Sequence, residues 1–328
     1  MKNLSYNSLN KISSNEYPKK SVLIIGSGFM AKQYCLALKK LGVKEVTILA
    51  RNRNKVKKLS EEFNFKFISG EINSELRNMD VVDLVIISTS ISSLMDITKY
   101  VIESGQKNIL IEKPGSLHHQ DLTDLEKIDG NIRIAYNRLA YTNFYKLKGI
   151  LKQEEITSCK YYITEKINSI NFNKNSSKIY TYWGISNSLH VISMAHELIG
   201  MPKEIYAKQF GKLKWHPSGS IFIGNGVTEK NIPFSYHADW ESAGRWGIEI
   251  MTKKHAYRLI PLEKLFVCKK GSFEWEEIPI EMSHPDVKQG ISEEIALMFN
   301  GDRKEELPSP KKGAEFIKLA EIIFGYNQ

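Results

Sequence analysis

The chain has 328 residues, of which 42% are hydrophobic, and carries a formal net charge of +9 at pH 7. This length exceeds the roughly 250 to 300 residues that one hydrophobic core commonly holds, so we expect two domains. No apolar run approaches the roughly 18 residues of a membrane helix, and the first 20 residues lack the apolar centre of a secretory signal, so we expect a cytoplasmic protein without a membrane partner.

The charge and the cysteines narrow the function classes further. The lysines are scattered and form no basic block with interleaved aromatic residues, so nucleic acid is not an expected partner. The histidines and the three cysteines have no metal-ligand spacing, so we expect no metal site. A reducing compartment suits this odd set of cysteines.

The first part of the chain alternates strands and helices. Residues 1–20 are polar and are predicted to form a loose arm. The expected strands then lie at 22–26, 45–50, 82–89 and 108–113, and the expected helices at 31–42, 54–64 and 94–103. This order predicts a doubly wound parallel sheet, the Rossmann type of α/β domain, over residues 21–137.

Beyond residue 137 the order of elements changes. Helices are expected at 143–151, 186–200 and 313–325, and strands at 159–167, 204–210, 220–224, 234–240, 246–252, 255–260, 264–269 and 273–280. Successive strands with short turns predict an α+β domain over residues 138–328 with a large, mostly antiparallel open sheet. Alternation places Tyr236, Ala238 and Trp240 on one face of this sheet. Few helices remain to cover the other face, so we expect a homodimer or homotetramer formed through it.

The turn after the first strand fits the pattern G-x-G-x-x-A as Gly26, Gly28 and Ala31. The first glycine permits a tight bend, the second lets a pyrophosphate approach the backbone, and the small third residue lets the helix pack close to the strand. The helix start at Phe29 and Met30 favours phosphate groups. A strand before this turn and a helix after it predict dinucleotide binding.

The end of the second strand indicates which dinucleotide is bound. Enzymes that use NAD place an acidic residue there, whereas this chain has Ala50 followed by Arg51, Asn52 and Arg53. Guanidinium groups attract the 2'-phosphate that a carboxylate would repel. We therefore expect NADP(H) as the preferred cofactor, with NAD(H) as the alternative. The competing interpretation is that the arginines form the solvated start of a helix.

The fourth strand ends in Glu112, Lys113 and Pro114. Ligands of open parallel sheets bind beyond the carboxyl ends of the strands, so these residues should point at the nicotinamide. An ordinary surface lysine before a turn is the alternative.

Four motifs together resemble the Gfo/Idh/MocA oxidoreductases, which include glucose-fructose oxidoreductase and inositol 2-dehydrogenase. They are GSGFMA at 26–31, EKP at 112–114, AYNRLAY at 135–141 and NSLHVIS at 187–193, and the resemblance extends over residues 21–328. It implies a Rossmann domain and a sheet domain with the active site between them. It also implies that Lys113 lies near the nicotinamide and the substrate, and that His190 is the acid/base residue.

The helix that carries His190 agrees with such a role. It is apolar nearly all round, so it should be buried, while Ser186, His190, Ser193 and Glu197 form a polar stripe along it. A polar stripe on a buried helix needs a cavity or a polar partner, although a histidine satisfied within the core is an alternative. The family usually has Asp where this chain has Ser186 and Ser193, so the expected relay of Lys, Asp and His is incomplete.

The resemblance implies hydride transfer between NADP(H) and a hydroxyl or carbonyl carbon of a sugar, polyol or nucleotide sugar. In this hypothesis Lys113 stabilises the developing alkoxide and His190 exchanges the proton. The other candidate contacts are Thr89 and Ser90 for the cofactor, where the family has Thr-Pro, and Arg138, Tyr182 and Asn187 for the substrate. The segment 235–250, together with PLEKL at 261–265, resembles members of surface-polysaccharide pathways. The two serines leave a second hypothesis open, a sensor or scaffold that binds NADP(H) without catalysis.

Overall fold

The computed structural model describes residues 17–173, 176–300 and 306–326. Residues 1–16 of the predicted arm lie outside this part of the chain. The described residues divide into two compact units. The parallel-sheet unit comprises residues 17–140, 282–300 and 306–314, and the mixed-sheet unit comprises residues 141–173, 176–281 and 315–326.

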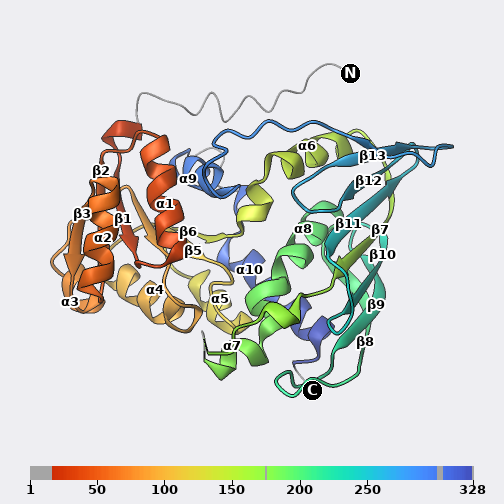
Figure 1. Ribbon diagram of the computed structural model, residues 1–328, viewed down its shortest axis with the longest axis horizontal. Coiled ribbons are helices and arrows are strands. Elements are labelled where there is room, and N and C mark those ends of the chain that lie inside the picture. Colours follow the sequence, from red (N-terminus) through yellow and green to blue (C-terminus); the bar gives the residue numbers. More distant parts are fainter. Residues whose placement is uncertain (1–16, 174–175, 301–305, 327–328) are drawn as a thin grey trace. The chain divides into compact units, whose positions relative to one another are not determined.

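The parallel-sheet unit is built on a six-stranded parallel sheet with the order β3-β2-β1-β4-β5-β6 (Figure 1). Its strands are β1 (Ser21–Ile25), β2 (Glu45–Ala50), β3 (Lys66–Ser69), β4 (Leu84–Ile87), β5 (Asn108–Glu112) and β6 (Asn131–Ala135). The central strands β1 and β4 are almost continuously apolar and buried, which is typical of strands covered on both faces. The strand order reverses between β1 and β4, so the predicted doubly wound fold is confirmed.

Helices of this unit come from two distant parts of the chain. The first part supplies α1 (Phe29–Lys40), α2 (Arg53–Phe63), α3 (Ile72–Leu76), α4 (Leu94–Glu103) and α5 (His119–Leu125). Much later in the chain, α9 (Ile291–Phe299) packs against α1. Sequence analysis missed β3, β6, α3, α5 and α9. The β6 sequence hides its strand character because Arg133, which is buried, interrupts the apolar run.

The mixed-sheet unit contains an eight-stranded sheet with the order β14-β13-β12-β11-β7-β10-β9-β8. Its strands are β7 (Ile156–Ile163), β8 (Pro202–Phe210), β9 (Ile221–Thr228), β10 (Pro233–Asp239), β11 (Trp246–Thr252), β12 (His255–Leu259), β13 (Phe266–Lys269) and β14 (Glu276–Glu277). Neighbouring strands are antiparallel except β7 and β10, which pair in parallel. The predicted open, mostly antiparallel sheet is therefore confirmed. The strand expected at 273–280 is reduced to two residues, because Phe273 is fully exposed and Pro279 cannot donate to a ladder.

One face of this sheet carries the core of the unit. Along β10 and directly after it, Tyr236, Ala238 and Trp240 are buried and His237 is exposed, as the alternation predicted. The helices of the unit are α6 (Thr142–Leu151), α7 (Ser177–Thr181), α8 (Leu189–Ile199) and α10 (Pro310–Phe324), which begins in the other unit. Figure 1 shows α6 and α8 on one side of the sheet. None of the helices in the described part of the chain has both the length and the apolarity needed to cross a bilayer.

Candidate functional site

The glycine turn lies between β1 and α1, where the strand order of the parallel sheet reverses. Gly26 has a φ of +130°, and a Cβ atom placed on it would lie 2.6 Å from the carbonyl oxygen of Ser88 at the end of β4. Only glycine fits such a bend. At Gly28, by contrast, no described residue apart from its two neighbours in the chain has an atom within 4 Å of the position that a Cβ would take. The turn is therefore tightly packed against β4 at Gly26 and is open at Gly28.

These features fit the phosphate-bearing part of a dinucleotide. The first backbone N–H groups of α1, from Phe29 onward, have no acceptors within their own helix. The open space at Gly28 permits a ligand to approach the backbone, and Ala31 is fully buried beneath the turn. At the end of β4, the buried hydroxyl of Thr89 has no hydrogen-bond partner among the described residues. The neighbouring Ser90 hydroxyl lies 2.8 Å from that of Ser93.

The three residues after β2 have different environments. Arg51 and Arg53 are exposed, and the guanidinium of Arg53 lies 5.9 Å from the centre of the Phe67 ring. The side chain of Asn52 caps α2, because its oxygen accepts a hydrogen bond of 3.0 Å from the backbone of Lys55. The two arginines therefore lie between the end of β2 and the exposed start of α2. This position is compatible with binding of a 2'-phosphate and equally with a purely solvated helix start.

The carboxyl ends of β5 and β6 bring two predicted cations to the same edge of the sheet. Lys113 follows β5 and is half-buried, and its peptide bond to Pro114 is cis. Arg138 lies in the turn after β6, where the neighbouring Asn137 side chain donates to the backbone oxygen of Gln289 at 2.9 Å. The edge at which ligands of such sheets bind is therefore positively charged.

Glu112, the last residue of β5, contacts a helix of the same unit. It is buried and accepts a hydrogen bond of 2.8 Å from the hydroxyl of Tyr34 on α1. Burial raises the pKa of Glu112, and the Tyr34 hydrogen bond and the charges of Lys288 and Lys113 oppose this rise.

A second buried carboxylate, Glu294 on α9, lies close to this pair. Neither of its oxygens has a hydrogen-bond partner in the described part of the chain. Burial, and then repulsion from Glu112, holds the pKa of Glu294 well above its ordinary value. Sequence analysis missed this residue. An acidic pair inside the otherwise apolar run ISEEIALMF was the available signal.

The mixed-sheet unit has a polar cavity of about 390 Å³ at one end of its sheet. Its walls come from the ends of β7 and β12, the start of β11 and the segment before α8. The lining residues that bear on function are Glu165, Trp183, Asn187, Arg245, Trp246 and Glu263. Of these, only Asn187 was a predicted substrate contact.

Glu165 is the buried carboxylate of this cavity. It accepts hydrogen bonds from the Asn187 amide at 2.7 Å and from the Ser188 hydroxyl at 2.5 Å. Burial raises the pKa of Glu165, and these two hydrogen bonds oppose the rise. Sequence analysis missed Glu165, although it continues the alternation of the buried residues Cys159, Tyr161 and Ile163.

His190 lies in the first turn of α8, three residues after Asn187, and is buried. The centre of its ring is 6.0 Å from that of Trp246, a residue of the cavity wall. The predicted polar stripe does not remain a continuous band, because residues Gly184–Ser188 form a π-helical turn that changes the helical phase before His190. The Ser186 hydroxyl donates to the backbone oxygen of Ile179 at 3.1 Å, and that of Ser193 donates to the backbone oxygen of His190 at 3.0 Å.

The remaining predicted residues of this unit lie away from the cavity. Glu197 forms an ion pair of 2.6 Å with Lys148 on α6. Tyr182 is not among the residues that line the cavity, and its ring packs at 5.0 Å from that of Tyr326.

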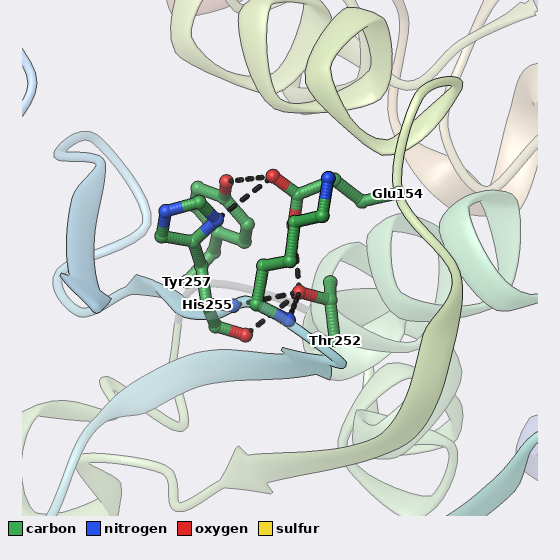
Figure 2. Close-up of polar contacts among 5 residues, drawn as sticks. Glu154, Thr252, His255 and Tyr257 are labelled. Atoms are coloured by element: carbon green, nitrogen blue, oxygen red, sulfur yellow. Dashed lines mark hydrogen bonds and ion pairs between the residues drawn. The ribbon is translucent and has the colours of Figure 1, made fainter. Parts of the chain in front are cut away.

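A separate polar cluster joins the end of α6 to the hairpin of β11 and β12 (Figure 2). The Glu154 carboxylate lies 2.6 Å from the Thr252 hydroxyl, 2.8 Å from Nδ1 of His255 and 2.9 Å from the Tyr257 hydroxyl. Burial by itself would raise the pKa of Glu154, but these hydrogen bonds outweigh burial and lower it. Because each group has a partner, the cluster has the character of a structural brace. Over the described ranges, no three His, Cys, Asp or Glu side chains gather as metal ligands would.

Comparison with known proteins adds sequence and fold relationships. The family model of shikimate/quinate 5-dehydrogenases matches residues 8–113, a range that includes the glycine turn and Lys113. No curated protein sequence matches the chain significantly.

Several solved structures share the fold over most of both chains. An oxidoreductase from Agrobacterium radiobacter in complex with NAD+, L-tartaric acid and magnesium is 13% identical, with a TM-score of 0.76 over 92% of this chain and 94% of that chain. A levoglucosan dehydrogenase in complex with NADH is 17% identical, with a TM-score of 0.75 over 93% and 95%. A UDP-N-acetylglucosamine 3-dehydrogenase from Acidithiobacillus ferrooxidans is 12% identical, with a TM-score of 0.73 over 93% and 97%. The chain therefore has the fold of the Gfo/Idh/MocA-type oxidoreductases, and the predicted resemblance is confirmed in the fold.

Proposed function

We propose that this protein is an NADP(H)-dependent oxidoreductase that acts on a hydroxyl or carbonyl carbon of a sugar, polyol or nucleotide sugar. The observation that carries the proposal is the glycine turn, which is closed at Gly26 and open at Gly28 at the strand-order reversal of a parallel sheet. The similar folds of a levoglucosan dehydrogenase and a UDP-N-acetylglucosamine 3-dehydrogenase support the substrate class.

The preference for NADP(H) rests on the end of β2. Ala50 is buried there and presents no carboxylate, and Arg51 and Arg53 are exposed beside it. Two guanidinium groups suit a 2'-phosphate, whereas the hydroxyl groups of NAD(H) would gain little from them.

A bound nicotinamide cofactor supplies the hydride chemistry. In the proposed reaction Lys113 stabilises negative charge on the substrate oxygen, since it follows β5 at the edge where ligands of such sheets bind. His190 exchanges the proton of the substrate hydroxyl, because its ring packs on a wall residue of the polar cavity. Arg138 is proposed to orient the substrate.

The cavity in the mixed-sheet unit supports a sugar as substrate. Trp183 and Trp246 offer aromatic faces to the apolar side of a sugar ring, and Asn187, Arg245 and Glu165 offer hydrogen-bonding groups to its hydroxyls. A role in surface-polysaccharide biosynthesis in the cytoplasm is the biological context that we propose, because of the resemblance in segment 235–250.

A fluorescence titration of the purified protein with NADPH and, separately, with NADH tests the cofactor. We expect NADPH to bind at least tenfold more tightly, a difference of about 1.4 kcal/mol. The matched variant Arg53→Ala should lose much of this preference, and Lys57→Ala, which changes an exposed cation further along α2, should retain it. Equal affinity for the two cofactors would contradict the assignment of the arginines. Oxidation of a panel of sugars and nucleotide sugars with NADP+ then tests the activity.

The alternative function is a sensor or scaffold that binds NADP(H) without catalysis. Two positions favour this alternative: Ser186 and Ser193 stand where the family usually has Asp. Their hydroxyls donate to backbone oxygens, so neither supplies a carboxylate to a proton relay. Tight NADPH binding without oxidation or reduction of any compound in the panel would support this alternative.

We also propose a homodimer or homotetramer formed through the sheet of the mixed-sheet unit. Tyr206, Phe210 and Ile223 are exposed on neighbouring strands of one face, where Ile223 pairs with Lys208. A second copy of the chain would remove this apolar surface from water.

A further inference from the structure

The segment before α9 is attached to α1 and to the turn after β6 by several contacts. The backbone N–H of Lys288 donates to the side chain of Gln33 at 2.9 Å, and the backbone oxygen of Gln289 accepts from Asn137 at 2.9 Å. Farther along α1, Lys40 pairs with Asp286 at 3.1 Å. All these residues belong to the parallel-sheet unit, so the late segment is part of the surroundings of the glycine turn.

The ammonium group of Lys288 has an unusual environment. It is half-buried, and its hydrogen-bond partner is the thioether sulfur of Met30 at 3.4 Å. An ammonium carries three donors, and a thioether is a weak acceptor, so among the described residues this contact leaves most of the donor capacity of the group unused. Burial and then the charge of Arg138 lower the pKa of Lys288, and the charges of Glu112 and Glu294 oppose this effect.

The contact with Met30 locates this ammonium near the start of α1. Met30 is the second residue of α1 and lies two residues after Gly28, where the turn is open. The start of a twelve-residue helix favours negative charge. Lys288 also interacts electrostatically with Arg138, and Lys113 acts together with Lys288 on Glu112, so three cationic side chains lie in this part of the unit. An anion is the ligand that these charges favour.

We propose that Lys288 is a further cofactor-binding residue, whose ammonium binds a phosphate group of the dinucleotide at the start of α1. This inference rests on the proposed function. It places a cofactor contact far beyond the segment 26–114, to which the sequence motifs confine the binding site. A substrate anion at the same position is the competing occupant, and it is an outcome of the test.

Titration of the full chain with NADPH in the absence of any sugar tests the inference. We expect Lys288→Gln to weaken NADPH binding about tenfold and to make the affinity less sensitive to sodium chloride, because one ion pair is lost. The matched control is Lys40→Ala, which loosens the same segment at its exposed ion pair with Asp286 and should change the affinity by less than about twofold. Unchanged NADPH affinity and salt dependence in Lys288→Gln would overturn the proposal and would leave the site to a substrate anion.

A second measurement uses the wild-type chain and does not depend on how well a variant folds. Saturating NADPH should protect Lys288 from acylation by an amine-reactive ester at least fivefold, as measured by peptide mass spectrometry, while Lys40 remains equally reactive. Bound NADPH without protection of Lys288 would also overturn the proposal. If the wild-type chain bound neither NADPH nor NADH, the proposed function itself would fail, and this outcome is distinct from a failure of the Lys288 assignment alone.

Discussion

Two glycines separated by one residue have different physical roles in the turn. Gly26 is required by the backbone, since its φ is positive and the Ser88 carbonyl leaves no room for a Cβ. Gly28 has an extended conformation that any residue adopts, and space surrounds it. A ligand that approaches the backbone is the reason for a glycine there.

We therefore expect two alanine substitutions to affect different properties of the protein. Gly26→Ala should lower the free energy of unfolding by about 2–4 kcal/mol, because it adds a steric clash to a strained φ. Gly28→Ala should change stability by less than about 1 kcal/mol and weaken NADPH binding by tenfold or more. Chemical denaturation and NADPH titration of both variants measure the two effects. Loss of stability in Gly28→Ala with NADPH affinity retained would contradict this division of roles.

Candidate site residues could be proposed from the sequence where the chemistry is local. The glycine turn, Lys113 and His190 stand in short motifs, so their positions follow from the chain itself. Glu165 and Lys288 could not be assigned in the same way, because each depends on which distant segment packs beside it. Only weak signals pointed to them, such as the continuation of the buried alternation of β7 to Glu165.

The hairpin of β11 and β12 depends on one carboxylate for its attachment to the end of α6. Thr252, His255 and Tyr257 all lie within hydrogen-bond distance of Glu154, whose side chain is only 11% exposed (Figure 2). Removing a buried acceptor leaves its donors without a partner, which costs more than the hydrogen bonds alone contribute.

We expect Glu154→Ala to lower the free energy of unfolding by about 1–3 kcal/mol at pH 7. The folded state lowers the pKa of Glu154, so its contribution is complete above the unfolded value of about 4.3 and is lost as the pH falls through the folded value. The destabilisation should therefore diminish in acid. Urea unfolding at pH 7 and near pH 3 tests both points, with Glu155→Ala as control. That neighbour forms an exposed pair with Lys253, so less than about 1 kcal/mol is expected. A pH-independent loss would contradict the proposed ionisation.

Elements were predictable where apolar periodicity is strong. Four of the parallel strands, α1, α2, α4 and α8 follow such patterns. Short elements were not predictable, because β3 is half-exposed along its four residues and β14 has only two. The π-helical turn at Gly184–Ser188 has no periodic signature. A Cβ on Gly184 would lie 2.2 Å from the Phe324 ring, so close packing by a distant residue accompanies this turn.

At the scale of the whole molecule, the sequence predicted the two sheets and their types, and the similar folds agree. The predicted domains were continuous stretches of chain, whereas the compact units are interleaved. Residues 282–300 and 306–314 pack with the parallel sheet, and the end of α10 returns to the mixed sheet. Hydrophobic periodicity indicates which face of an element is buried, but it does not indicate which unit the element packs against. The assignment of these late segments to the two units could therefore not be predicted from the sequence.

The exposed apolar group on β8 and β9 leads to a prediction about assembly. Tyr206 and Phe210 are 58% and 51% exposed, and Ile223 on the neighbouring strand is 36% exposed. A negative charge buried in an interface without a partner is strongly unfavourable. We therefore expect the wild-type chain to elute as a dimer or tetramer, and Phe210→Glu with Ile223→Glu to yield monomers, as measured by light scattering after size-exclusion chromatography. Phe273→Glu, in the turn between β13 and β14, is the matched control and should not change the assembly. A monomeric wild-type chain, or equal assembly of the double variant, would mean that this face is not the interface.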